Sequence, residues 1–101
     1  MTSTTVVRYK THPARADENE QLIRAVFADL ADQHPAGIQY VALRLDDEVS
    51  FVHVAVLTTE ENPLGALRTF REFLSGVSER CVEGPAPTSA TIVGSYGFLG
   101  H

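Results

Sequence analysis

The chain has 101 residues, of which 44% are hydrophobic and 21% charged, with a formal net charge of -5. This size and composition predict one folded domain spanning residues 1–101 and exclude wholesale disorder. A mildly acidic chain without a basic run is a poor binder of nucleic acid or anionic membranes. The start of the chain resembles no signal peptide, and no apolar stretch approaches about 18 residues. We therefore expect a cytoplasmic protein with neither nucleic-acid nor membrane partners.

The first half of the chain predicts a strand, a helix and a hairpin. Residues 5–11 are rich in β-formers, and His12-Pro13 ends them. From Asp17 to Gln33 apolar residues recur at the spacing of one helical face, and the segment from His34 to Gly37 ends this helix. Ile38–Leu45 and Val49–Thr58 read as strands, and the short polar link between them predicts an antiparallel hairpin.

The second half predicts one helix and one strand. Asn62-Pro63 is a typical helix start, and an apolar 3–4 periodicity follows over residues 63–80. Residues 84–87, Gly-Pro-Ala-Pro, are expected to form a loop, and Ala90–Leu99 a last strand. The order β-α-β-β-α-β is that of an α+β, ferredoxin-like fold. It predicts a four-stranded antiparallel sheet with two helices on one face.

Side-chain alternation divides each expected strand into two sets. One set is almost wholly apolar and is expected to pack under the helices: Val7, Tyr9, Val41, Leu43, Leu45, Val52, Val54, Val56, Ile92 and Tyr96. A bulge at Gly94 would move Tyr96 to the other face. The second set mixes apolar and polar side chains: Val6, Arg8, Lys10, Tyr40, Ala42, Arg44, Phe51, His53, Ala55, Leu57, Thr91, Val93 and Ser95. A face of this mixed kind favours a ligand or a second copy of the chain.

The element order, the length and the half-polar open face resemble the dimeric α+β barrel superfamily. Within it, roughly residues 4–99 look most like the antibiotic-biosynthesis-monooxygenase-like proteins. The resemblance implies a homodimer formed through the open sheet face. It also implies cofactor-free oxidation of an aromatic or quinol-like small molecule. The haem-degrading members use an Asn, a Trp and a helix-borne His. Such a role is disfavoured here, because the chain has no Trp, no His in residues 63–80 and no Asn in its first strand.

His53 is the strongest candidate for chemistry, as a base that prepares a substrate for reaction with oxygen. Arg8 is the second catalytic candidate, since a guanidinium can stabilise developing negative charge. The expected ligand-binding residues are Tyr40, Arg44, Phe51 and Ser95. Arg8 and Arg44 can equally form ion pairs, Tyr40 can equally fill a core or an interface, and His53 can equally be a buried residue satisfied by a Tyr or a carboxylate.

No cofactor and no metal site are expected. The four histidines, His12, His34, His53 and His101, lack the short spacings of metal ligands. The single cysteine, Cys81, reads as a half-buried apolar residue. Two function classes stay open: a cofactor-independent monooxygenase, and a non-catalytic homodimer that binds a small ligand in the same cavity. A metabolite-sensing regulator is disfavoured because no DNA-binding element is present.

Overall fold

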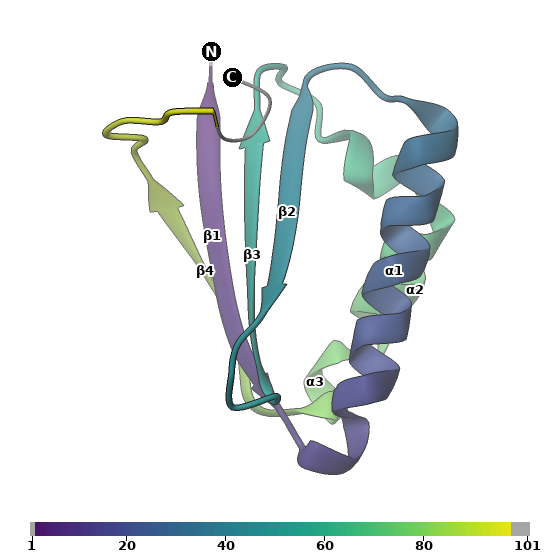
Figure 1. Ribbon diagram of the computed structural model, residues 1–101. Coiled ribbons are helices and arrows are strands. Elements are labelled where there is room, and N and C mark those ends of the chain that lie inside the picture. Colours follow the sequence, from purple (N-terminus) through teal and green to yellow (C-terminus); the bar gives the residue numbers. More distant parts are fainter. Residues whose placement is uncertain (1, 98–101) are drawn as a thin grey trace.

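A computed structural model of the chain describes residues 2–97. Four strands form one antiparallel sheet in the order β2-β3-β1-β4: β1 (Ser3–Thr11), β2 (Ile38–Arg44), β3 (Ser50–Leu57) and β4 (Cys81–Ala90). The helices α1 (Ala16–Gln33), α2 (Arg68–Ser75) and α3 (Val77–Arg80) all cover the same face of the sheet, as Figure 1 shows. The predicted ferredoxin-like fold is thus confirmed.

The first half of the chain follows the sequence closely. Helix α1 ends where His34 adopts a left-handed conformation (φ 49°) and its N–H donates to the carbonyl of Leu30. In the β2–β3 turn the Asp47 carboxylate accepts from the backbone N–H groups of Val49 and Ser50. These bonds fix the predicted hairpin, in which the two strands pair from Ile38–Leu57 to Arg44–Phe51.

The last strand lies at a different place from the predicted one. Strand β4 runs along β1 over residues 81–90, so the expected loop at 84–87 belongs to the sheet. Residues 91–97 form no strand, and residues 98 and 99 of the expected strand lie outside the described part of the chain. Proline is tolerated here because β4 is an edge strand, whose outward N–H positions need no partner.

The expected helix over residues 63–80 is divided into three pieces. A 3-10 turn over Pro63–Ala66 begins with the predicted cap, in which the Asn62 side chain accepts from the N–H of Leu64. Extended geometry at Leu67 separates this turn from α2, and Gly76 separates α2 from α3. The glycine lowers the helical preference of the segment there. The two breaks allow the chain to turn down toward β4.

The hairpin faces are opposite to the prediction. Tyr9 lies across from Phe51, and Val7 across from His53, so these four side chains share the helix-covered face. The paired positions of β2 place Tyr40, Ala42 and Arg44 on that face as well. The face without helices instead carries an apolar set that we call the open face: Val6, Val41, Leu43, Val52 and Val54. Alternation separates two sets but does not say which one a helix covers.

The core therefore lies between the helices and an unusually aromatic sheet face. Its buried members are Tyr9, Ala16, Ile23, Val26, Phe51, Leu64, Leu67, Phe73 and Val77. The rings of Tyr9 and Phe51 stack with centroids 5.4 Å apart, and Phe73 of α2 packs against the Tyr9 ring. Large rings fill much of the space between the sheet and the helices, whereas Val6, Val41, Val52 and Val54 lie on the open face.

Candidate functional site

His53 lies in the middle of β3 and is bracketed by two tyrosines. Its Nε2 is 2.7 Å from the hydroxyl of Tyr9, and its Nδ1 is 2.5 Å from the hydroxyl of Tyr40. The three rings come from adjacent strands, since β3 pairs with β1 on one side and β2 on the other. His53 and Tyr9 are buried, and Tyr40 is half-buried. Both ring nitrogens of His53 are thus engaged by phenol groups.

The polar contacts continue from Tyr9 into the helices. The Nδ2 of Asn19 donates to the Tyr9 hydroxyl at 2.9 Å, and the Nε of Arg80 donates to the Oδ1 of Asn19 at 3.0 Å. Arg80 also donates from Nη2 to the carbonyl of Phe73 at 2.6 Å. We call the series Arg80–Asn19–Tyr9–His53–Tyr40 the polar chain. It crosses the core from α3 to β2.

Asn19 and Arg80 are held in place by helix geometry. Asn19 occupies the buried stripe of α1 together with Ala16, Ile23 and Val26. Arg80 stands three residues after the buried Val77 in α3, and its guanidinium packs on the Phe73 ring at 5.2 Å. Both side chains are almost fully buried, at 0% and 2% exposure. Buried polar groups of this kind are stable only when hydrogen-bonded, and the polar chain meets that requirement.

The protonation states in the polar chain follow from burial. Removal from water lowers the pKa of His53 to about 4, because it penalises the charged imidazolium. The same cause raises the pKa of both Tyr9 and Tyr40 well above the ordinary value. At neutral pH His53 is therefore a neutral imidazole between two neutral phenols. One of its nitrogens donates and the other accepts.

An apolar cavity of about 180 Å³ lies against the polar chain, between the sheet and the helical segments of residues 63–80. Tyr9, Tyr40 and His53 line it together with two further polar residues, Thr5 and Asn62. The rest of its wall is apolar: Val7, Ala55, Leu57, Leu64, Phe70, Phe73, Leu74, Val77 and Pro85. An apolar protein cavity of roughly 150 Å³ accommodates benzene. The space thus suits a single aromatic ring.

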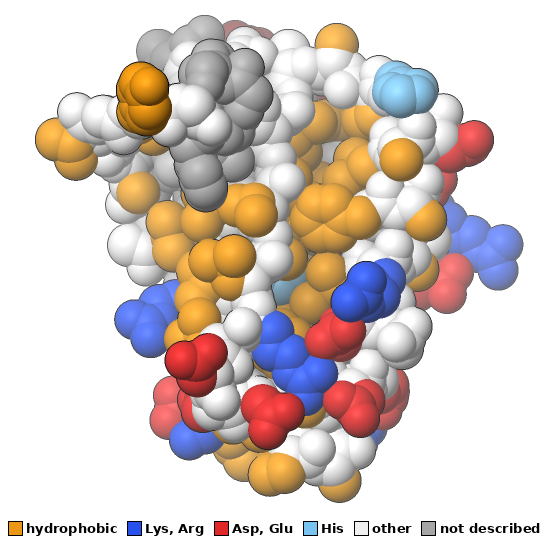
Figure 2. All heavy atoms as spheres, in the orientation of Figure 1, with side chains coloured by type: hydrophobic (Ala, Val, Ile, Leu, Met, Phe, Trp, Pro, Cys, Tyr) orange, Lys and Arg blue, Asp and Glu red, His pale blue; other side chains and the backbone are white. Residues whose placement is uncertain are grey.

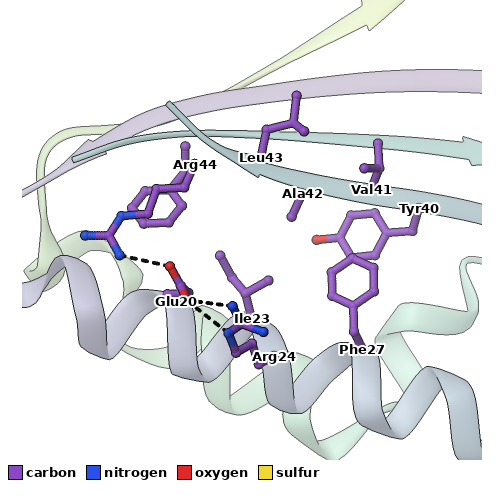
Figure 3. Close-up of a pocket in the computed structure, with 10 residues that line it drawn as sticks. Glu20, Ile23, Arg24, Phe27, Tyr40, Val41, Ala42, Leu43 and Arg44 are labelled. Carbon is purple, nitrogen blue, oxygen red and sulfur yellow. Dashed lines mark hydrogen bonds and ion pairs between the residues drawn. The ribbon is translucent and has the colours of Figure 1, made fainter. Parts of the chain in front are cut away.

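A second, more open pocket of about 470 Å³ lies between α1 and the edge of β2. Figure 2 shows a hollow with hydrophobic walls on this side and charged side chains gathered at one end. In Figure 3 Tyr40 lies over Phe27, with ring centroids 5.0 Å apart, and its hydroxyl points inward along the pocket. Tyr40 borders both spaces. It is the member of the polar chain placed to meet a ligand from either one.

The predicted site residues are only partly brought together. Tyr40 contacts His53 directly, whereas Phe51 lies beside it in the core and stacks on Tyr9. Arg44 is at the rim of the wider pocket and pairs with Glu20 at 2.9 Å and Asp17 at 3.1 Å. Arg8 is exposed on the opposite face of the sheet, so its predicted place beside His53 is wrong. Ser95 is exposed in a segment without strand structure.

Three members of the polar chain are missed or given another role by sequence reasoning. The strand pattern places Tyr9 on the correct face but assigns it to the core. Asn19 could have been noticed, because it lies four residues before Ile23 on the same helical stripe. Arg80 carries no comparable signal, since an arginine near a helix end is ordinarily exposed. Only the fold shows that these groups meet.

We next consider the potential metal ligands among the described residues. Among residues 2–97 no three His, Cys, Asp or Glu side chains are grouped as metal ligands, and His101 lies outside that range. Cys81 is partly buried, and burial raises its thiol pKa. Over the same range no helix is long and apolar enough to cross a membrane.

No protein-family model and no curated protein matches the chain. Solved structures do. SnoaB from Streptomyces nogalater, a cofactor-independent oxygenase solved as a point mutant, superposes with a TM-score of 0.66 at 22% identity over 95% of this chain and 97% of SnoaB. A candidate antibiotic biosynthesis monooxygenase from Nitrosomonas europaea gives 0.74 at 12% identity, covering 91% and 90% of the two chains. A similar protein from Caulobacter crescentus gives 0.72 at 17% identity, covering 92% and 91%. The chain thus has the fold of the antibiotic-biosynthesis-monooxygenase-like proteins.

Proposed function

We propose that this protein binds a small aromatic, quinol-like molecule beside His53 and oxidises it with molecular oxygen, without metal or flavin. The observation that carries the proposal is the juxtaposition of a ring-sized apolar cavity with the buried Tyr40–His53–Tyr9 group. Sites for small molecules are mostly apolar with a few placed polar groups. The fold shared with SnoaB, a cofactor-independent oxygenase, supports the same reaction class.

The proposed reaction needs only the substrate and oxygen. A 1,4-quinol and molecular oxygen give a hydroxybenzoquinone and water. The quinol loses two hydrogen atoms and gains one oxygen atom, and the second oxygen atom leaves in water with those two hydrogens. The quinol first gives a phenol proton to solvent water, because its anion can pass an electron to oxygen, and this proton is one of the two hydrogens that end in the product water. Stabilising that anion is the contribution required of the protein.

The residues have distinct roles in this proposal. Tyr40 contacts the substrate oxygen, since it borders the cavity and the wider pocket. His53 acts through Tyr40, because both of its ring nitrogens are already bonded to phenols. Phe73 and Leu64 form part of the wall that packs on the ring. Arg8 has no part in the site, because it lies on the far face.

The proposal is tested by oxygen uptake with methylhydroquinone at pH 7, in the presence of a metal chelator and without added flavin. We expect uptake above the buffer rate for wild type, and at least tenfold less for Tyr40→Phe. Tyr96→Phe removes the same atom from a side chain that is 99% exposed and should keep the wild-type rate. Uptake equal to buffer in wild type would contradict the oxygenase function.

The second candidate function is binding without catalysis in the same cavity. It is favoured by the lowered pKa of His53, which makes the imidazole a weak base at neutral pH. Calorimetry under argon separates the two functions. Tight binding of methylhydroquinone together with buffer-level oxygen uptake would support the binding protein and exclude the oxygenase.

We further propose that two copies associate through the open face. Val6, Val54 and Val41 lie in register across β1, β3 and β2, with Val52 and Leu43 in the next row. A sheet face of half-exposed aliphatic side chains favours burial against another surface. The dimer that we propose uses the sheet face without helices, as expected from the sequence. Of its residues only Val6 belongs to the expected open set, and the ligand cavity lies inside each chain.

A further inference from the structure

In the polar chain each group donates a proton to the next, and the donors and acceptors present determine in which direction this runs. Arg80 has only N–H donors, so the Asn19 atom facing it must be the carbonyl oxygen. This contact orients the amide, whose assignment otherwise depends on the hydrogen-bond network. The Asn19 NH2 group therefore faces Tyr9 and donates to its oxygen. Asn19 cannot accept a proton from Tyr9 at this contact.

The direction passes from Tyr9 to His53. The Tyr9 oxygen has two partners, at 2.9 Å (Asn19 Nδ2) and 2.7 Å (His53 Nε2). A phenol has one proton to donate. Since the Tyr9 oxygen accepts from Asn19, the Tyr9 proton is donated to Nε2 of His53. The neutral His53 must then carry its own proton on Nδ1 and donate it to the Tyr40 oxygen.

We infer that the polar chain turns Tyr40 into a fixed hydrogen-bond donor toward the ligand space, so that the ligand is an aromatic molecule with an acceptor oxygen such as a quinolate or an aryl ketone. Tyr40 already accepts from His53, and its remaining proton points to one of the spaces it borders. Arg80 and Asn19 are positioning residues that act through Tyr9 and His53. This inference rests on the proposed ligand site but not on oxidation.

The opposite direction leaves a proton without a partner. If Nε2 of His53 carried the proton, the Tyr9 oxygen would accept twice, from His53 and from Asn19. The Tyr9 proton would then have no acceptor among the described side chains, although Tyr9 is only 5% exposed. An unsatisfied buried donor is costly. The half-buried Tyr40 is the better place for the unpaired proton, because a ligand or water can accept it there.

The first test measures the His53 tautomer by two-bond proton–nitrogen correlation on the full chain at pH 7, without ligand. The His53 ring is identified by its contact with the ring of Phe73, whose centroid is 5.5 Å away. We expect the proton on Nδ1 in wild type. A proton on Nε2 would overturn the inference.

An isosteric variant reverses the direction. In Asn19→Asp the carboxylate accepts from Arg80 and from the Tyr9 hydroxyl, so Nε2 must become the donor to Tyr9. We expect the proton of His53 to move to Nε2 in this variant. Gln21→Glu adds the same charge on the exposed side of α1 and should leave the tautomer unchanged. A folded Asn19→Asp protein with the wild-type tautomer would overturn the relay.

The ligand role is tested with acetophenone and ethylbenzene, which share a ring and differ in the acceptor oxygen. We expect wild type to bind acetophenone about three- to tenfold more tightly, the effect of one hydrogen bond. Tyr40→Phe and Asn19→Asp should both lose this preference. Equal affinities in wild type would overturn the donor role of Tyr40. If neither probe binds, both the proposed ligand site and the donor role of Tyr40 are wrong. The tautomer measurement decides the direction of the polar chain separately.

Discussion

At the scale of single residues, the molecule is defined by a polar chain inside an aromatic core. Each of its five side chains is bonded to a neighbour on a different element, so no group can be removed without leaving a partner unsatisfied. Such networks stabilise a core only when they are complete.

The tyrosines on either side of His53 should differ in their contribution to stability. Tyr9→Phe leaves both Nε2 of His53 and the Asn19 amide without a partner in the core, and we expect a loss of about 2–3 kcal/mol. Tyr40→Phe should cost less, because Tyr40 is only half-buried. Urea denaturation checks this order, with the exposed Tyr96→Phe as the control that should lie within about 0.5 kcal/mol of wild type.

His53 should make stability depend on pH. The pKa of His53 is about 4 in the folded chain and about 6.5 when exposed. Between these values the unfolded chain binds a proton that the folded chain does not, so the free energy of unfolding falls as the pH falls. From pH 6.5 to 5 we expect a loss of about 1.6 kcal/mol. Urea denaturation across this range measures it, and His53→Gln should flatten the profile; an equally steep profile in that variant would refute the assignment.

The candidate site could be predicted only in part from the sequence. His53 and Tyr40 are predicted to share one face of the hairpin, because strand alternation shows this, and the structure brings their side chains into contact. Arg8 was expected beside His53 because alternation alone does not fix the register between strands. In the observed register Val7 lies opposite His53, and Arg8 lies opposite Val52 on the open face. Arg80 and Asn19 belong to the site through tertiary contacts between helices and sheet that no local pattern reports.

At the scale of elements, the edge position of β4 explains the one misplaced strand. Residues 90–99 contain β-formers such as Ile92 and Val93, and local preference selects them over a segment with two prolines. The pairing with β1 decides otherwise: Val7 lies opposite Pro87 and Arg8 opposite Ala86. The other strands and α1 were predictable because their periodicity and end signals agree with the tertiary structure.

The location of β4 leads to a stability prediction. Val93 is fully exposed, so Val93→Ala should leave the free energy of unfolding within about 0.5 kcal/mol of wild type. Val26 of α1 is 2% exposed in the core, and Val26→Ala should cost about 2 kcal/mol through the loss of two buried methyl groups. Chemical denaturation of both variants decides the point. A loss near 2 kcal/mol for Val93→Ala would place residue 93 in a packed strand, like the last strand that the sequence pattern predicts over Ala90–Leu99.

At the scale of the whole molecule, the sheet has two apolar faces with different uses. The helices cover the aromatic face, and among residues 2–97 no helix lies on the valine-rich open face. Composition alone does not distinguish a core from an interface, since both are apolar. This is the physical reason why the sequence pattern assigns the aliphatic set to the core.

The proposed dimer can be disrupted from the open face. Val54 stands between Val6 and Val41 in its centre, so Val54→Asp should convert a dimer into a monomer by introducing an unpaired charge. Sedimentation velocity at micromolar concentration measures the mass. Ala28→Asp puts the same charge on the exposed surface of α1 and should leave the mass unchanged. A wild-type protein that sediments as a monomer would rule out the dimer.

The central claim is that the ligand lies under the helices, beside Tyr40 and His53, and not on the open face. Methyl chemical-shift mapping with methylhydroquinone under argon tests it most directly. We predict that the methyl signals of Ala55, Leu57 and Leu64, which line the cavity, move on titration, while those of Val6, Val52 and Val54 stay in place. Shifts confined to the three open-face valines would contradict the account and place the ligand between two sheets.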